Sequence, residues 1–455
     1  MGMGLRKRER QEEFWIATES LPEVPRHIFY EKLNGVLAEG EFDEFVEELC
    51  EPYYTANVGR DSIPPGVYFR MLFIGYFEDI TSQRGIAWRC SDSRSLSCFL
   101  GYGLDERTPD HSSLSRIRDR LPLKVHEQVF CFVLGLAEEH KLLSNKTVAV
   151  DSTYLEANAA MKSIVRKESG EDWKEYVKRL AEAEGVEISS DEDLRKFDKK
   201  RKNKKVSNDE WESKTDPDSR VTKMKDGRTH LAYKAEHTID LETEFILDAS
   251  LYHADEADTA TLTESLSSAT ENLEQAEVYR DIEEAVADKG YHANKTLTDC
   301  RDWGCFGLRT YIPEPDSPHE RRWTDKPEEY KEVVYANRRR VRGSRGKGLQ
   351  KKRSELVERS FAHICETGGA RRTWLRGLEK VKKRYKMVAA ARNLGLVMRK
   401  LFGIGKPRCL QGGCLLTYFI HPARHSLKSA LSGPRRFIRS ISSLSAKVHP
   451  TTAAI

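Results

Sequence analysis

Apolar residues recur at helical spacing through the first third of the chain. Residues 68–77 follow Pro64 and Pro65, which can open a helix, and their apolar side chains fall three or four positions apart. The same pattern predicts further helices over 83–90, 93–101, 112–121 and 125–140. We therefore expect a mostly helical domain over 25–143, preceded by an N-terminal extension at 1–24.

One of these predicted helices, 112–121, carries arginines, including Arg116 and Arg118. Short helices separated by turns, one of them rich in arginine, suit a helix-turn-helix-like DNA reader. An ordinary helical bundle fits the pattern equally well. DNA binding by residues 25–143 is therefore a hypothesis that this pattern permits without requiring it.

At Lys146 the spacing changes to that of β-strands. Short β-branched and apolar runs predict strands at 147–153, 230–239, 245–253, 285–288 and 307–312. Helical patterns lie between or after them at 257–272, 294–302 and 349–363. This order predicts an α/β domain over 144–405, built as a mixed sheet flanked by helices.

Three segments depart from this pattern. Residues from about 161 to 225 are highly charged and poor in large apolar groups, so we expect an insertion that is helical around 173–183 and otherwise a mobile loop. Residues 313–347 are also loop-like. Beyond about residue 405 there is no acidic residue, and we expect 406–455 to be a basic, disordered tail.

Composition limits the class of protein. The 455 residues are too many for one ordinary core and suggest roughly two to four domains. Hydrophobic residues make up 38% and charged residues 33%, and the mean hydropathy is −0.64, which argues against an integral membrane protein. The nine cysteines include no CxxC pair, and residues 1–11 do not resemble a secretion signal, so we expect a reduced, cytoplasmic chain.

The net charge of +4 conceals an asymmetry along the chain. Residues 337–455 contain 29 Lys and Arg but four acids, so the first 336 residues are net acidic. Such a concentration of positive charge is what binding to a phosphate backbone needs, although a solvated basic surface produces it too. No glycine-rich phosphate loop of the Walker type occurs, which argues against an ATPase or a kinase.

Two predicted strands each end in an aspartate, Asp151 and Asp288. An aspartate after a strand is often a turn former or a helix cap. Neighbouring strand ends converge in such sheets, however, and two carboxylates close together cannot both stay ionised without compensation. A divalent cation would compensate them, and Mg²⁺ prefers oxygen ligands of this kind.

A third acid would complete such a site. Glu355 and Glu358 lie three residues apart in the predicted helix 349–363, within the most basic part of the chain. Charge balance on a surface helix would also explain them. We take Glu358 as the third acid and keep Glu355 as the alternative.

Three motifs in this order resemble the DDE transposases of bacterial insertion sequences, in the retroviral-integrase superfamily. They are VAVDST at 148–153, ADKGY at 287–291 and VERSF at 357–361. Flanking segments resemble the same family, at 99–101, 109–113, 116–118, 371–377 and 387–401. The resemblance covers roughly residues 25–405.

The resemblance implies an RNase H-like core in which Asp151, Asp288 and Glu358 are catalytic and bind metal, Mg²⁺ or in its place Mn²⁺. Two metal ions would clamp the attacking and leaving oxygens of an in-line displacement. Water would first free a 3′-hydroxyl at the element's end, and that hydroxyl would attack target DNA. One departure is clear. The positions where many relatives carry auxiliary Tyr, Arg and Lys are Lys351, Ser354 and Cys365 here.

The implied partner is double-stranded DNA, as terminal inverted repeats and as target, bound by a homodimer in the synaptic complex, with no membrane involved. The implied location is the bacterial cytoplasm, at the nucleoid. The basic residues that we predict to contact DNA are Arg116, Arg118, Arg338, Arg339, Arg340, Lys351, Lys352, Arg353, Arg359, Arg371, Arg372 and Arg376.

Two other functions fit the same sequence. One is a catalytically silent DNA-binding protein derived from such an enzyme. The other is an RNase H-like nuclease that cleaves a structured nucleic acid without strand transfer.

Overall fold

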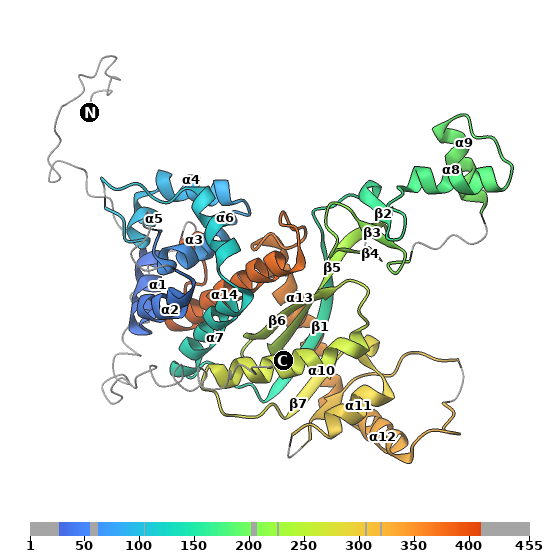
Figure 1. Cartoon of the computed structure of the whole chain (residues 1–455). Coiled ribbons are helices and arrows are strands. Elements are labelled where there is room, and N and C mark those ends of the chain that lie inside the picture. The colour runs from blue at the N-terminus through green and yellow to red at the C-terminus, as the bar shows by residue number, and fades with distance from the viewer. Residues whose placement is uncertain are drawn as a thin grey trace, which may run out of the picture.

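The computed structural model describes residues 27–54, 62–103, 105–201, 207–224, 227–304, 307–318 and 321–410. The chain begins with a group of helices, α1 to α7, on one side of the molecule (Figure 1). Their bounds are Ile28–Glu39, Phe42–Cys50, Pro65–Phe77, Gln83–Asp92, Arg94–Phe99, His111–Arg120 and Leu123–Glu139. The predicted helical character of this region is confirmed.

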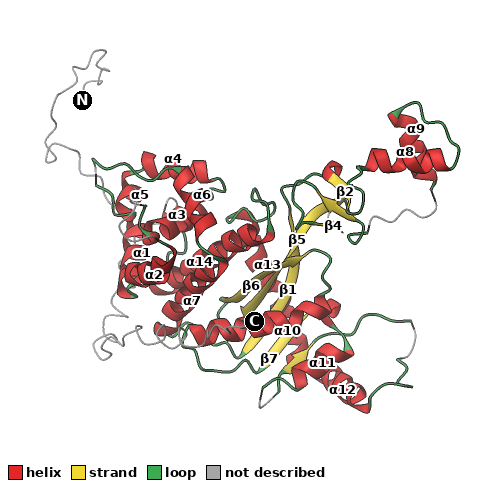
Figure 2. Cartoon of the chain, in the orientation of Figure 1, coloured by secondary structure: helices red, strands yellow, loops and turns green. Residues whose placement is uncertain are grey.

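A mixed sheet follows, and its strands can be traced in Figure 2. Its main strands are β1 (Thr147–Glu156), β5 (Thr229–Asp240), β6 (Ile246–His253), β7 (Glu284–Ala287) and β8 (Arg309–Tyr311). β5 pairs antiparallel with both β1 and β6, whereas β1, β7 and β8 run parallel. The short β4 (Arg220–Lys223) pairs with the beginning of β5.

Helices cover both faces of this sheet. Helix α10 (Asp258–Gln275) lies on one face, where Ser152 of β1 donates a hydrogen bond to Asp258. Helices α13 (Ser344–Glu366) and α14 (Leu378–Phe402) lie on the other, where His237 of β5 contacts Ser360 and Tyr385. The predicted mixed sheet flanked by helices, behind a mostly helical N-terminal region, is therefore confirmed.

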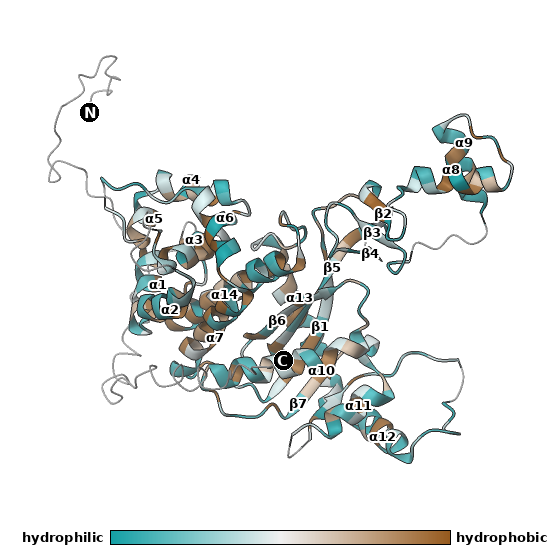
Figure 3. Ribbon diagram, in the orientation of Figure 1, coloured by the Kyte–Doolittle hydropathy of each residue, from teal (hydrophilic) through white to brown (hydrophobic). Residues whose placement is uncertain are grey.

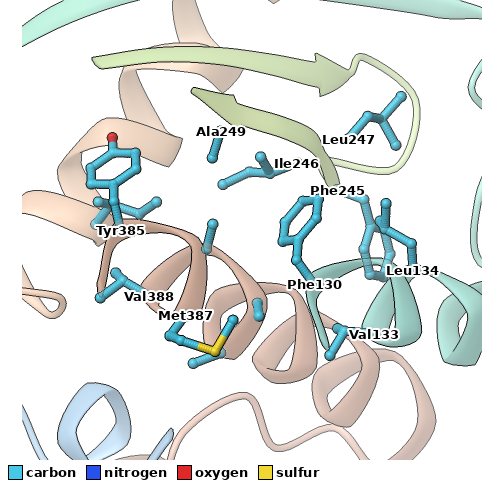
Figure 4. Packing of buried hydrophobic residues seen from close by; sticks show 14 of the residues in the cluster. Phe130, Val133, Leu134, Phe245, Ile246, Leu247, Ala249, Tyr385, Met387 and Val388 are labelled. Carbon is cyan, nitrogen blue, oxygen red and sulfur yellow. The ribbon is translucent and has the colours of Figure 1, made fainter. Parts of the chain in front are cut away.

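The helical region and the sheet share one hydrophobic core. Side chains of β6 pack between α7 and α14, and Figure 4 shows Phe130 and Leu134 of α7 close to Phe245 and Ile246. Hydrophobic residues gather on the strands and on these inner helices in Figure 3. Because α7 packs on α14 and α10, and both of these helices pack on β6, the N-terminal helices are fixed against the sheet.

At each of two outer strands, a buried asparagine side chain forms hydrogen bonds with the backbone. The side-chain amide of Asn393 in α14 accepts a hydrogen bond from the N–H of Ile246 and donates one to its carbonyl. Asn337 in α12 (Glu328–Arg342) makes the same pair with Ile312, just after β8. Both asparagines are fully buried, so each satisfies backbone groups that water cannot reach.

Two predicted loops contain regular structure instead. The insertion at 161–225 holds the predicted helix, α8 (Trp173–Ala183), but also α9 (Asp191–Lys200). It also holds a two-stranded antiparallel sheet of β2 (Ile164–Arg166) and β3 (Trp211–Ser213). Tyr176 of α8 packs edge-on against Trp211, which supplies a small apolar centre within a highly charged segment. These elements form an arm that extends beyond the sheet (Figure 1).

The second loop prediction, 313–347, is wrong over its latter half, because α12 lies there and α13 begins at Ser344. Apolar Val333 and Val334 are buried one turn from Asn337, which gives this polar, arginine-rich helix a narrow inner face. The predicted tail at 406–455 begins with a short 3-10 helix, Pro407–Leu410. The rest of it, and the predicted extension at 1–24, lie outside the described residues.

Replacing Asn393 by alanine should destabilise the fold. Asn393→Ala leaves two buried backbone groups of Ile246 without partners, which costs about 2–4 kcal/mol in the free energy of unfolding. Lys400→Ala, at an exposed position of the same helix, is the matched control and should change it by less than about 0.5 kcal/mol. Denaturant unfolding followed by circular dichroism measures both, and equal stability of the two variants would contradict the assignment.

Candidate active site

The two predicted aspartates lie side by side. Strands β1 and β7 are parallel neighbours whose last registered pair is Val150 with Ala287. Asp151 and Asp288 are the next residue on each strand, and register neighbours point to the same face of a sheet. The chain positions these carboxylates by strand pairing, although 137 residues of sequence separate them.

Asp151 differs in one respect from its predicted position at a strand end. Strand β1 continues to Glu156, because β5 supplies antiparallel partners beyond the point where β7 stops, including His237 opposite Asp151. Only the pairing with β7 ends at Val150. The carboxylate of Asp151 therefore projects from a continuous strand at the place where its parallel neighbour turns away.

Arg353 of α13 lies between the two carboxylates. Its Nη1 is 2.7 Å from Oδ2 of Asp151, and its Nη2 is 3.8 Å from Oδ1 of Asp288. The arginine side chain is 12% exposed, against 26% for Asp151 and 52% for Asp288. The positive charge of Arg353 thus lies between two carboxylates and offsets the repulsion between them.

Gln350 fixes this arrangement to the sheet. Its Oε1 accepts a hydrogen bond from Nε of Arg353, and its Nε2 donates to the carbonyls of Ala287 and Tyr311. These carbonyls lie at the ends of β7 and β8. Helix α13 is therefore anchored one turn before Arg353 to the strand end that carries Asp288.

Glu358 lies outside these contacts. It is exposed, and its Oε1 accepts a hydrogen bond from Ser354 on the same helix. Five helical residues separate it from Arg353, which places the two side chains roughly 140° apart around the helix axis. No group of three His, Cys, Asp or Glu side chains that could hold a metal ion occurs among the described residues. The structure brings together two of the three predicted acids.

Glu355, the alternative third acid, is paired with a basic residue of its own helix. It is exposed and pairs with Arg359 at 2.5 Å. Arg359 in turn reaches Glu244, in the turn between β5 and β6. Neither glutamate of α13 contacts Asp151 or Asp288 in this arrangement.

A buried polar network lies on the opposite face of the sheet, directly behind Asp151. Glu236 of β5 accepts hydrogen bonds from Tyr291 (2.8 Å), Thr261 and Ser265. Lys234 lies 2.7 Å from Asp258 and 3.4 Å from Glu236. Burial raises the pKa of Glu236, and the ammonium of Lys234 opposes this shift.

This network fixes the loop after Asp288. Tyr291 ends the short 3-10 turn Lys289–Tyr291, and its hydroxyl reaches across to Glu236 on β5. Ser152, the neighbour of Asp151, donates to Asp258 in the same network. Sequence reasoning missed these residues. The one signal was a pair of charged residues, Lys234 and Glu236, inside a predicted strand.

The predicted DNA-contacting residues divide into two groups. Those exposed at the surface are Arg116, Arg339, Lys351, Lys352, Arg371, Arg372 and Arg376. Those held mainly by the protein's own groups are Arg118, Arg338, Arg340, Arg353 and Arg359. Arg371 and Arg372 of the first group also lie near acids, Glu366 and Glu156, but their side chains are 75% and 47% exposed. The first group is therefore the better candidate for contacts to phosphates.

The loop between α13 and α14 extends the site along β1. Glu156, the last residue of β1, exchanges backbone hydrogen bonds with Arg371 and Thr373. Trp374 follows, 57% exposed, with the Arg372 guanidinium 5.6 Å from its ring centre. Its exposed ring beside three surface arginines is available for stacking on a base.

Two family models match the chain. A transposase domain (DUF772) matches residues 19–120, and a transposase DDE domain matches residues 314–398. The second match includes Arg353 and Glu358, whereas Asp151 and Asp288 lie outside both matches. No curated protein matches the chain.

The solved structures similar to this chain include two transposases. One is piggyBac transposase in a synaptic complex with hairpin DNA, at 11% identity, covering 95% of this chain and 91% of that one, with a TM-score of 0.31. Another is Mos1 transposase in a paired-end complex with the left transposon end, at 11% identity, 71% and 86% coverage and a TM-score of 0.17. Scores this low carry no argument about the present chain.

Each of the two matched regions is similar to a transposase domain, and the second is similar to a transposase DDE domain. For this chain in particular, the predicted resemblance to DDE transposases is thereby confirmed.

Removing the hydroxyl of Tyr291 should loosen the loop after Asp288. Tyr291→Phe deletes a buried hydrogen bond to Glu236 and should lower the free energy of unfolding by roughly 1–3 kcal/mol. Tyr279→Phe is the matched control, because Tyr279 is 82% exposed, and should change it by less than about 0.5 kcal/mol. Thermal melting compares the two, and an unchanged melting temperature for Tyr291→Phe would refute the role of the network.

Proposed function

We propose that this protein is a DNA transposase that cleaves at the ends of a mobile element, with a divalent metal, and joins the freed 3′-hydroxyl to target DNA. The observation that carries the proposal is the registered pair of aspartates, Asp151 and Asp288, in a chain with transposase domain matches on both sides of them. The resemblance supplies the reaction, and the strand pairing supplies a place for it.

The residues present fit a divalent cation in part. Asp151 and Asp288 offer partly exposed carboxylate oxygens on one face of the sheet, and the guanidinium between them marks a place where positive charge is stabilised. Mg²⁺ is commonly held by one or two carboxylates together with water and substrate phosphate. Such an ion would polarise the scissile phosphodiester and stabilise the charge that develops during displacement.

Glu358 is proposed as the third metal ligand on its match to the family's motif. In the described arrangement its exposed carboxylate accepts a hydrogen bond from Ser354. Metal binding by Glu358 would replace this hydrogen bond. Glu355 remains the alternative third ligand. It would have to give up its ion pair with Arg359 before it could bind a metal ion.

The chain's own residues would bind and orient the DNA. The exposed arginines and lysines of α6, α12, α13 and the loop before α14 would neutralise backbone phosphates. Arg371, Arg372 and Arg376 lie on the loop that pairs with the end of β1, so they extend the surface that begins at Asp151. Trp374 would stack on an exposed base beside them.

The proposal extends to the organisation of the chain. Residues 25–143 would form a DNA-binding domain and 144–405 the catalytic domain, with the arm at about 161–225 as its insertion. Two copies would pair the element's ends, in the cytoplasm at the nucleoid. Among the helices that the structure describes, none is long and apolar enough to cross a membrane.

The outward position of Glu358 favours a second candidate, a DNA-binding protein that no longer catalyses strand transfer. The products of the reaction distinguish a transposase from a nuclease that lacks strand transfer, because only a transposase joins pre-cleaved ends to a target plasmid.

Replacing either aspartate should remove catalysis and spare DNA binding. Asp151→Asn and Asp288→Asn should each lower Mg²⁺-dependent nicking of a terminal-repeat duplex by roughly 100-fold or more. Asp299→Asn, at an exposed site on α11 (Asn294–Arg301), serves as the control and should keep full activity. Gel-shift binding should stay within about threefold of wild type for all three variants. Full nicking by Asp151→Asn would exclude the assignment.

The third acid can be identified by comparing the two glutamates of α13. Glu358→Gln should reduce nicking as strongly as the aspartate variants, whereas Glu355→Gln should keep most of it. Both are exposed on the same helix, so neither should change stability by more than about 0.5 kcal/mol. The opposite ranking in the nicking assay would assign the role to Glu355, and wild-type activity in both would leave the site with two acids.

A further inference from the structure

We propose that Arg353 is the internal counter-ion of the two aspartates in the metal-free protein, and that a divalent cation binds there by displacing it. The inference rests on the proposed function for the identity of the site. It concerns how the site is held before metal arrives, and it makes Arg353 a competitor of the ion.

The guanidinium of Arg353 is directed at both aspartates. Arg353 directs Nη1 at Asp151 and Nη2 toward Asp288, while Nε donates to Gln350. All three of its nitrogens therefore face groups of the site. Its neighbours Lys351 and Lys352 are exposed, so within this basic run the third residue alone has its side chain turned into the sheet edge.

Both carboxylate oxygens of Asp151 accept hydrogen bonds. Oδ2 lies 2.7 Å from Nη1 of Arg353, and Oδ1 accepts the backbone N–H of Ser152 at 2.8 Å. A metal ion that binds Oδ2 would lie against the guanidinium, because the ion and Nη1 would share this one oxygen. Mg²⁺ also demands near-ideal geometry, which leaves little tolerance for a shared ligand.

The site carries a net negative charge. Two carboxylates and one guanidinium carry a net charge of −1, so the arginine leaves the pair incompletely neutralised. Adding a divalent ion while Arg353 stays would place two cationic centres against the same two acids, where like charges repel. The contacts that hold the guanidinium are with the side chains of Asp151, Asp288 and Gln350. It can therefore leave the two aspartates without breaking a backbone hydrogen bond.

The consequence is a direct exchange between two occupants. In the metal-free protein Arg353 links α13 to the ends of β1 and β7 and suppresses repulsion between the aspartates. When the ion binds, this link is released, and the guanidinium becomes available to the phosphates of the DNA that the proposed function places there. Gln350, with its hydrogen bonds to the carbonyls of Ala287 and Tyr311, keeps the helix on the sheet in both states.

The test is Mn²⁺ binding to the full-length protein without DNA, measured from the electron paramagnetic resonance signal of the free ion. Arg353→Gln removes the charge and keeps a polar side chain, and it should bind Mn²⁺ about tenfold more tightly because no competitor has to leave. Lys352→Gln removes the same charge from the adjacent exposed position and should stay within about twofold of wild type.

A second measurement guards against misfolding. The metal-free Arg353→Gln variant should melt at a lower temperature than wild type, and saturating Mn²⁺ should raise its melting temperature by more than it raises that of the wild type. Arg353→Lys keeps the charge without the two-pronged geometry, so its affinity for Mn²⁺ should lie between those of Arg353→Gln and wild type.

The outcomes separate the inference from the proposed function. If wild type binds Mn²⁺, Asp151→Asn abolishes this binding, and Arg353→Gln binds no more tightly than Lys352→Gln, the counter-ion role is overturned while the metal site stands. If wild type binds no Mn²⁺, or Asp151→Asn binds it unchanged, both are overturned. Tighter binding by Arg353→Gln alone supports both.

Discussion

The parallel pairing of β1 with β7 is the constraint on which the rest of the site depends. It ends at Val150 and Ala287, and it therefore sets two negative charges next to each other on one face of the sheet. An arrangement of this kind is unfavourable unless something compensates it. The structure supplies the compensation from a distant helix, through Arg353, and holds that helix in place through Gln350.

The surroundings of the pair serve to keep it rigid. Behind the sheet, Tyr291 and Ser152 connect the residues next to each aspartate to a buried network around Glu236 and Asp258. In front of it, His237, the partner of Asp151 in β5, contacts α13 and α14. Burial holds the pKa of His237 well below its usual value, so its neutral ring joins the two helices to the strand without adding charge.

Much of this could be predicted from the sequence, for reasons that differ between elements. The strands at Thr147 and Glu284 are short β-branched or apolar runs, and the fold class followed from their order with the helices. Helix α12 was missed because its inner face is narrow and its sequence is dominated by arginine and glutamate. The two-stranded sheet in the arm was missed because the apolar centre of the arm consists of few residues, among them Tyr176 and Trp211.

The site was predictable only as far as strand order determines it. Asp151 and Asp288 could be placed together because adjacent parallel strands bring their ends together. The direction in which a helical side chain points depends on how the helix is rotated against the sheet, and sequence spacing does not give that rotation. Hence Arg353 was expected at DNA and lies between the acids, while Glu358 was expected among them and faces outward.

Asp151 and Asp288, the aspartates next to the last registered pair of β1 and β7, are proposed to form a cation site. The most direct measurement is an anomalous difference map from crystals of the full-length protein grown with Mn²⁺. We expect a Mn²⁺ peak within bonding distance of carboxylate oxygens of both Asp151 and Asp288, and we expect the Arg353 guanidinium to have moved away from Asp151. A map with the ion at other residues, or with Arg353 still between the two carboxylates at saturating Mn²⁺, would contradict it.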